Sequence, residues 1–157
     1  LLLTNQGDLV NEIMKAGNFH EKEYLVTVDR PVTEDFLQKI RSGVPILGTV
    51  TRPCVAEKKE EYEFRIVLTQ GLNRQIRRMC SYLGYEVKKL KRIRIMNLTL
   101  ENLKVGEYRE ATKSEIQELK RQIEKEKTVR GKEVYRGGKP VKNPGKYRNP
   151  EKKFRKK

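Results

Sequence analysis

The residues with the clearest chemical potential are three arginines, Arg74, Arg77 and Arg78, in the segment Gln70–Cys80. On a helical wheel they lie opposite an apolar stripe that consists of Ile76, Met79, Cys80 and Leu83. From Gln70 to Arg94 the sequence holds eight basic residues and one acidic residue. Such clustering on a folded surface is typical of a site for phosphate backbones. The alternative is a basic helix face that is merely solvated. The segment after the helix is equally basic, and this favours the phosphate site over that alternative.

Other chemistry-bearing side chains are few. Cys54, Cys80 and His20 do not make a zinc ligand set, and no Ser-His-Asp group or phosphate-cradling glycine loop is present. We therefore do not expect a zinc site. Both cysteines are interpreted as buried core thiols. The three aspartates stand where helix caps or turns are expected, at Asp8, Asp29 and Asp35.

The elements that must position these residues alternate between short strands and short helices. Tyr24, Val26 and Val28 share one face of a predicted strand, and Thr33 is a predicted helix cap. Because strands outnumber helices and connections are short, the sequence predicts an α+β domain with a mainly antiparallel sheet. Residues 1–4 are expected to end a buried strand; further strands are expected at 23–29, 48–55, 62–69, 86–100 and 106–111, and helices at 8–17, 34–42, 73–83 and after a capping box at 112–115.

The positive charge is concentrated in the last part of the chain. The 157 residues carry a net charge of +15, and residues 127–157 hold 13 Lys+Arg against 2 Asp+Glu. That segment contains scattered prolines and no periodic apolar pattern, so we expect a domain at 1–126 and a basic disordered tail at 127–157. The tail is interpreted as an arm on nucleic acid or, alternatively, as a solubilising extension. No export signal and no membrane-spanning run is visible, so a cytoplasmic location is expected.

Five motifs, in order and spacing, resemble the ribosomal small-subunit-type (RsuA-like) pseudouridine synthases. They are Leu1–Asn11, Lys22–Val28, Gly43–Gly48, Gln70–Cys80 and Leu90–Arg92. The resemblance implies a mixed, mainly antiparallel sheet flanked by helices, with an RNA cleft across it. It also implies isomerisation of a uridine in 23S rRNA to pseudouridine after the base is flipped from its stack. No cofactor or metal is implied, a tRNA stays open as a second substrate, and a monomer is expected.

The resemblance also assigns roles to particular residues. Tyr24 would stack on the flipped uracil and assist proton removal from C5, Arg77 would pair with the catalytic aspartate, and Leu90 would form part of the apolar pocket floor. For Tyr24 the alternative is an ordinary core tyrosine. Phosphates or flanking bases would be contacted by Arg74, Arg78, Lys89 and Arg92.

The family's catalytic aspartate lies in an Arg-Leu-Asp motif that, by the family spacing, would fall about seven residues upstream of Leu1. The amino-terminal S4-type domain of the subfamily is likewise not in the sequence given. We therefore expect the chain as given to lack turnover by itself. The alternative is a noncatalytic RNA-binding or ribosome-assembly module, and the gene sequence immediately before Leu1 distinguishes the two.

Overall fold

The computed structural model describes residues 1–14 and 18–135, and for residues 126–135 it describes the backbone alone. At its centre is a five-stranded sheet of order β4-β5-β1-β6-β7 in which every neighbouring pair is antiparallel. None of the described helices is long and apolar enough to cross a membrane. The elements are α1 (Gly7–Met14), β1 (Lys22–Val28), α2 (Glu34–Ser42), β2 (Pro45–Ile46), β3 (Thr49–Val50), β4 (Val55–Glu60), β5 (Glu63–Leu68), α3 (Gln75–Tyr82), β6 (Val87–Ile95), β7 (Leu98–Thr99) and α4 (Lys113–Tyr135).

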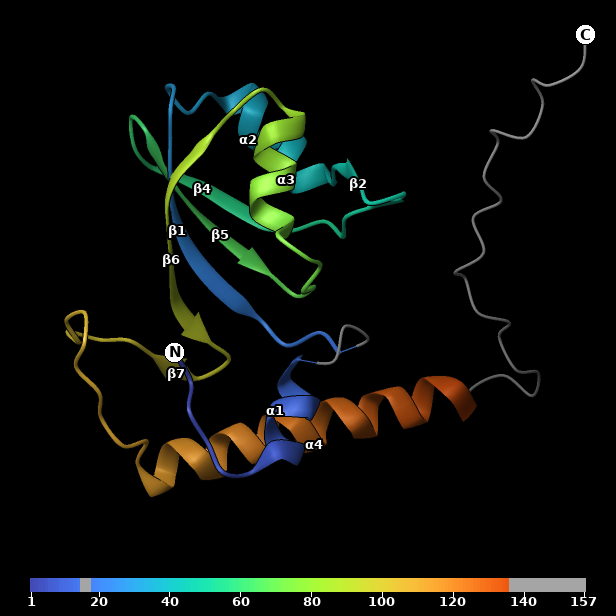
Figure 1. The fold of residues 1–157 in the computed structure, drawn as a ribbon. Coiled ribbons are helices and arrows are strands. Elements are labelled where there is room, and N and C mark those ends of the chain that lie inside the picture. Colours follow the sequence, from blue (N-terminus) through green and yellow to red (C-terminus); the bar gives the residue numbers. More distant parts are fainter. Residues whose placement is uncertain (15–17, 136–157) are drawn as a thin grey trace, which may run out of the picture.

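Helices α2 and α3 cover one face of the sheet and enclose the main core (Figure 1). Thr33 caps α2 by accepting a hydrogen bond from the amide of Phe36 at 3.1 Å, which satisfies one of the free donors at the helix start. Phe36 then packs edge-on against Phe64 of β5, with ring centroids 5.3 Å apart. The apolar periods of helix and strand therefore meet in one core.

A second, smaller cluster lies at the far end of the sheet, where α1 and α4 pack together below β6 and β7 (Figure 1). It joins Ile13 of α1 to Leu119 and Ile123 of α4 and to Ile95 at the end of β6. Thr112 and Glu115 form the predicted capping box at the start of α4, each accepting the other's amide, at 3.1 and 2.8 Å. The packing of α4 is thus set at its first turn.

Two bulges in β6 decide which of its side chains share a face. Opposite β1, the pairing shifts between Glu23 and Tyr24 and again between Thr27 and Val28, so β6 carries an extra residue at each point. Residues directly opposite each other in a sheet point to the same side. The face shared with Tyr24 is therefore Val87, Leu90, Arg92 and Ile95, and the other face carries Lys89, Lys91 and Arg94.

The predicted fold class is confirmed, and the strands at 23–29 and 62–69 and the first three predicted helices appear within a few residues of their expected positions. The strand expected at 106–111 is wrong. Lys104 and Glu107 form a local turn there, with the Glu107 amide donating to the Lys104 carbonyl at 3.1 Å, and β7 already provides the sheet edge. An extended segment without a neighbouring strand to pair with gains no ladder hydrogen bonds.

One further strand expectation is wrong, and another is confirmed only in part. Residues 1–4 lie outside any described strand, and Leu1 and Leu3 are exposed. Within 48–55, interpreted as an edge strand or bulge, Thr49–Val50 form the short strand β3, which pairs with β2. The edge strand of the main sheet is β4, whose single buried side chain is Ala56. Its run of charged residues has no alternating apolar pattern, and the strand exists because β5 pairs with it.

Helix α4 continues without a break across the boundary predicted at residue 126, to Tyr135. The division of the chain at that residue stays a prediction. Residues 127–135 were expected to begin a disordered tail and are helical instead. Most of them are compatible with a helix, and they extend a helix whose first turns are already packed against the second cluster. The rest of the predicted tail, 136–157, lies outside the described residues.

Candidate functional site

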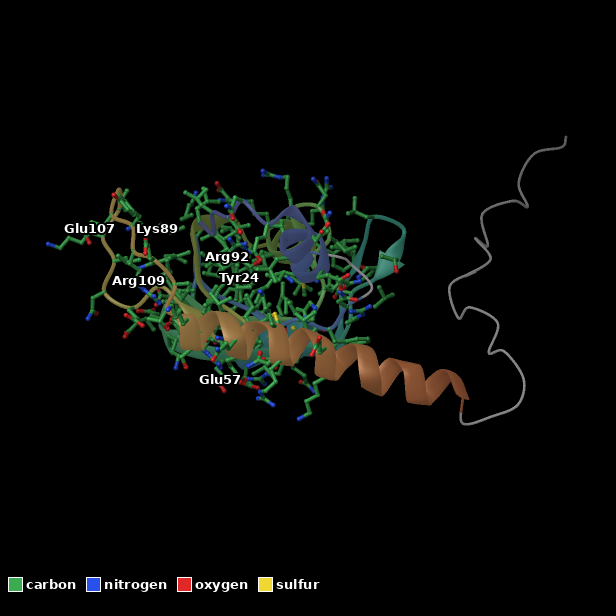
Figure 2. The ribbon with its side chains drawn as sticks, turned by 90° about the horizontal axis from the view of Figure 1, so that it is seen from below. Tyr24, Glu57, Lys89, Arg92, Glu107 and Arg109 are labelled. Atoms are coloured by element: carbon green, nitrogen blue, oxygen red, sulfur yellow. The ribbon has the colours of Figure 1, made fainter. Side chains whose placement is uncertain are left out.

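The candidate site is the face of β1 and β6 that also carries α3. Tyr24 lies directly opposite Arg92, and Val26 lies directly opposite Leu90. In Figure 2 the labels of Tyr24 and Arg92 lie next to each other, in agreement with this pairing. The structure therefore brings together three of the predicted site residues, Tyr24, Leu90 and Arg92.

Tyr24 is half-buried and packs against the edge of the main core beside Ile66, its partner on β5. Within the described residues its hydroxyl makes no hydrogen bond, so the ring is held and the hydroxyl stays available. Leu90 is 36% exposed although the neighbouring Val26 is fully buried. A half-covered aromatic ring beside a partly exposed leucine is the composition expected of a binding pocket wall.

Helix α3 aims Arg77 toward the same face. Its Nη1 donates to the backbone carbonyl of Val87, the residue at the start of β6, at 2.9 Å. The guanidinium is half-buried and uses one donor in this bond, which fixes its position and leaves further donors. No acidic side chain pairs with it among the described residues. Arg77 is therefore an anchored cation suited to holding a carboxylate.

Arg74 and Arg78 lie at the solvent side of α3. Arg78 folds back on the preceding loop and donates from Nε to the Asn73 carbonyl at 3.1 Å. Arg74 precedes the first helical residue with φ 50°, a left-handed conformation that costs a residue with a side chain about 1 kcal/mol. It is exposed and has no ion pair within the described residues. A strained, unpaired arginine at a helix start is consistent with a ligand contact.

The buried Gln75 and the partly buried Gln70 fix the loop that leads into α3, a role that the sequence reasoning missed. Gln75 is buried, its Oε1 accepts from the Leu72 amide at 3.1 Å, and its Nε2 donates to Gln70 at 3.4 Å. The same Gln70 oxygen accepts from the Arg52 amide at 3.1 Å. Nothing in the spacing of the glutamines distinguishes them from surface residues, so only the folded chain shows this role.

The opposite face of β1 and β6 has a different electrostatic arrangement. Glu23 is buried and accepts hydrogen bonds from Arg65 on β5 and from Nε of Arg94 on β6, the latter at 2.6 Å. The bond from Arg65, together with that from Arg94, holds the pKa of Glu23 below its ordinary value of 4.5. Lys89 and Lys91 are exposed on this face. The predicted RNA contact Lys89 is therefore not brought together with Tyr24.

The two cysteines are core residues, as expected from their positions. Cys80 is fully buried, and burial raises the pKa of its thiol to about 12. Cys54 is partly buried, and burial raises its pKa to about 11. Neither thiol is a nucleophile near neutral pH.

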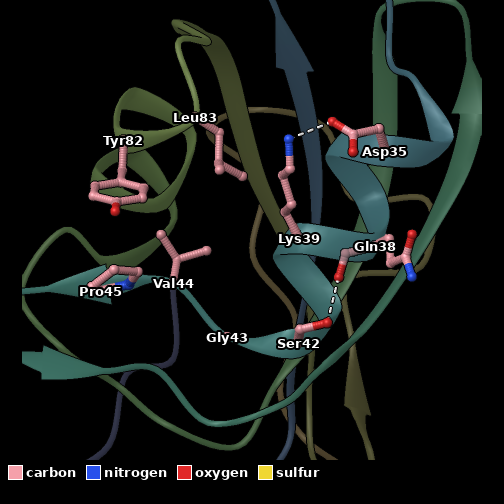
Figure 3. Close-up of a pocket in the computed structure, with 9 residues that line it drawn as sticks. All are labelled: Asp35, Gln38, Lys39, Ser42, Gly43, Val44, Pro45, Tyr82 and Leu83. Carbon is pink, nitrogen blue, oxygen red and sulfur yellow. Dashed lines mark hydrogen bonds and ion pairs between the residues drawn. The ribbon is translucent and has the colours of Figure 1, made fainter.

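A groove of about 560 Å³ lies elsewhere, between α2 and the end of α3 (Figure 3). Its only cation, Lys39, is paired with Asp35 at 2.6 Å, and the Ser42 hydroxyl donates to the Gln38 carbonyl at 2.8 Å. These polar groups are thus occupied within their own helix. None of the predicted site residues lines the groove, so the candidate site remains the face around Tyr24.

The antiparallel sheet with two helices packed on one face defines the chain as an α+β protein. The family model described as RNA pseudouridylate synthase matches residues 1–82, and the chain belongs to that family. The dual-specificity RNA pseudouridine synthase RluF of Escherichia coli (strain K12) is 59% identical over 124 residues, which are 79% of this chain and 43% of RluF. Within the RsuA-like family, the sequence motifs resemble ribosomal large-subunit pseudouridine synthase F in particular. The identity to RluF confirms that resemblance.

More distant relatives agree. Ribosomal large subunit pseudouridine synthase B of Bacillus subtilis is 33% identical over 126 residues, covering 76% of this chain and 52% of that protein. A crystal structure of a pseudouridylate synthase superimposes with a TM-score of 0.70 and 34% identity, covering 74% of this chain and 52% of that chain. The chain therefore spans about half the length of the relatives that it matches, or somewhat less.

Proposed function

We propose that this chain forms most of the catalytic cleft of an RNA pseudouridine synthase of the cytoplasm that isomerises a uridine in 23S rRNA. The observation that carries the proposal is the pairing of Tyr24 with Arg92 on the α3 face beside Leu90, on the strand β6 to whose first residue Arg77 is anchored. The 59% identity to RluF supports the same reaction.

The proposed reaction breaks the bond between N1 of uracil and C1′ of ribose, rotates the base, and joins C5 to C1′. C5 loses a proton and N1 gains one, so no external reductant or co-reactant is needed. Tyr24 supports the flipped uracil with its ring, and its unbonded hydroxyl is placed to assist proton removal from C5. Leu90 contributes an apolar contact to the base.

Arg77 is proposed to hold the family's catalytic aspartate. A carboxylate that acts on a ribosyl carbon must be ionised and aimed, and an arginine at hydrogen-bond distance lowers its pKa by about 1–3 units. The bond from Arg77 to the Val87 carbonyl keeps the guanidinium in place before the aspartate arrives. Phosphates of the RNA are proposed to contact Arg74, Arg78 and Arg92, which lie on α3 or on the Tyr24 face, whereas Lys89 lies on the opposite face.

The test uses a version of the chain that continues upstream through the Arg-Leu-Asp motif. It is incubated with stem-loop transcripts of 23S rRNA that carry tritium at C5 of uridine, and released tritium is counted. We expect release, and loss of release when that aspartate is replaced by asparagine. Tight binding without tritium release would support the alternative of a noncatalytic RNA-binding or ribosome-assembly module. The same assay with tRNA transcripts tests whether the enzyme accepts a second class of RNA.

A further inference from the structure

An exposed aromatic residue lies near the site with a guanidinium stacked on it. Phe19, in the segment before β1, is 51% exposed, and the Cζ of Arg52 lies 4.1 Å from its ring centroid. Neither residue belongs to the motifs from which the function was inferred. Both come from loops, and the loops are far apart in the sequence.

Arg52 is held in place from several sides. Its amide donates to Gln70 Oε1 at 3.1 Å, and its Nη1 donates to the Thr69 carbonyl at 3.3 Å. On either side of it, the Thr51 amide donates to the Val44 carbonyl at 3.0 Å and the Cys54 amide donates to the Arg41 carbonyl at 3.1 Å. The amide bonds fix the backbone around Arg52, and the Nη1 bond with the ring contact orients the guanidinium before any ligand binds, which lowers the entropy cost of stacking.

The pair lies close to the candidate site. Thr69 follows directly after β5, in which Leu68 pairs with Lys22 and Ile66 pairs with Tyr24. The Thr69 carbonyl, which accepts from Arg52, is three residues of extended chain from Ile66. Three residues span about 10 Å. The bond from Arg52 to Gln70 also joins it to the loop that leads into α3.

We propose that Phe19 and Arg52 form a stacking platform for an unpaired nucleobase that flanks the uridine held at Tyr24. This inference rests on the proposed function, because it assumes that RNA occupies the face around Tyr24. An aromatic ring and a guanidinium plane are the two surfaces on which proteins stack unpaired bases. The arginine adds positive charge next to the phosphates of the same nucleotide.

The platform explains an exposure that the fold itself does not require. A phenylalanine with half of its surface in water loses hydrophobic stabilisation, and the covered side of its ring faces a cation instead of the core. A base stacked on the open face of the ring would remove that face from water. Because every base has a π-face, such a platform selects unpaired RNA over duplex and tolerates different bases.

The experiment measures binding of the chain to a fluorescently labelled stem-loop RNA and to a blunt RNA duplex of the same number of phosphates. Phe19→Leu should weaken binding of the stem-loop about 10-fold and leave duplex binding unchanged. Phe19→Tyr keeps an aromatic ring and should restore the affinity. Tyr108→Leu, at an exposed tyrosine in the loop before α4, is the matched control and should change neither affinity.

A second readout places 2-aminopurine at successive loop positions of the stem-loop. One position should be quenched on binding, and Phe19→Leu should remove that quenching. Equal affinity of the wild-type chain and Phe19→Leu for the stem-loop, with a lower melting temperature in the variant, would show that the pair only ties two loops together, and would overturn the proposal. An equal loss on stem-loop and duplex would also overturn it. Failure of the wild-type chain to bind either RNA would instead overturn the proposed function and this inference with it.

Discussion

The two faces of the sheet formed by β1 and β6 carry similar residue types and use them differently. On the face beside α3, Arg92 lies opposite the half-buried Tyr24 and Arg77 is bonded to the start of β6. Neither arginine has an acidic partner among the described residues. On the opposite face, Arg65 and Arg94 are neutralised by Glu23, a buried carboxylate between them. One face thus keeps its cations available, and the other face uses them to fasten three strands together.

The difference shows that a count of basic residues does not locate a nucleic-acid site. Arg92 and Arg94 are two positions apart on one strand, yet a bulge at Ile93 places them on opposite faces. A buried ion pair removes a cation from the field that a phosphate would experience, whereas an unpaired arginine keeps it. The availability of each charge depends on its partner.

The largest effect is expected at Arg77, on the proposed catalytic face. In the version extended through the Arg-Leu-Asp motif, Arg77→Met should reduce turnover at least ~100-fold, since breaking a buried charge pair costs ~3–5 kcal/mol. RNA affinity should change little, because one phosphate contact alters the salt slope by only ~1. Tritium release and filter binding measure the two quantities. Arg78→Met is the control. If Arg77→Met left turnover intact and weakened RNA binding, Arg77 would be a phosphate contact only.

Tyr24→Phe tests the same face with a smaller change. It keeps the stacking ring and removes the hydroxyl, so we expect near-normal RNA binding and ~100-fold slower turnover, the typical contribution of positioned proton transfer. Melting should barely change, because the hydroxyl has no partner within the described residues to lose. A lowered melting temperature with normal turnover would leave Tyr24 as a core residue alone.

Glu23→Gln tests the structural face. At neutral pH it should cost roughly 2 kcal/mol in free energy of unfolding, measured by urea titration, because both arginines lose a charged acceptor. The pKa of Glu23 is lower in the folded than in the unfolded chain. Its contribution is therefore present above pH ~4.3 and is lost as the pH falls through the folded pKa.

The difference in free energy of unfolding between wild type and Glu23→Gln should consequently become smaller at acidic pH. Glu57→Gln, which touches the same network only at Arg65 and from an exposed position, should cost less than ~0.5 kcal/mol. If this difference in free energy of unfolding did not change with pH, Glu23 would stabilise the fold through its shape and not through its charge.

Arg92→Gln and Lys91→Gln compare the two faces at neighbouring positions. Arg92 lies beside Tyr24, and Lys91 lies opposite Leu25 on the other face. We expect Arg92→Gln to weaken binding of a stem-loop RNA ~5-fold and to lower the salt slope by ~1, and Lys91→Gln to do neither. Equal effects would show that RNA contacts both faces, which would return Lys89 to the predicted contact set.

The smallest effect is expected at Arg74. Arg74→Gly relieves the left-handed strain, so the free energy of unfolding should stay the same or rise by up to ~1 kcal/mol, while RNA affinity falls about 2- to 3-fold. Thermal melting and filter binding on the same samples check both. Lower stability with unchanged affinity would mean that the arginine serves the fold and not the ligand.

The sequence by itself determined the fold class, the family and most of the local elements. Thr33, Gly43 and the Thr112–Glu115 capping box act within one or two turns of chain, so their chemistry is legible from neighbouring residues. The apolar alternation of β5 and the stripe of α3 required no knowledge of their partners either. The basic character of α3 and β6 was likewise visible in the order of residues.

Only the tertiary structure decided which face each side chain occupies and which charges are neutralised. The bulges at Lys88 and Ile93 arise from pairing with β1. They place Val87 and Lys89 on opposite faces, and likewise Arg92 and Arg94. The charged strand β4 exists through its ladder to β5, and the segment around Gly106 is not a strand because no partner remains for it. Glu23 and the Phe19–Arg52 pair acquire their roles from residues more than 30 positions away. Pairing and burial are properties of contacts between distant segments, and local patterns do not contain them.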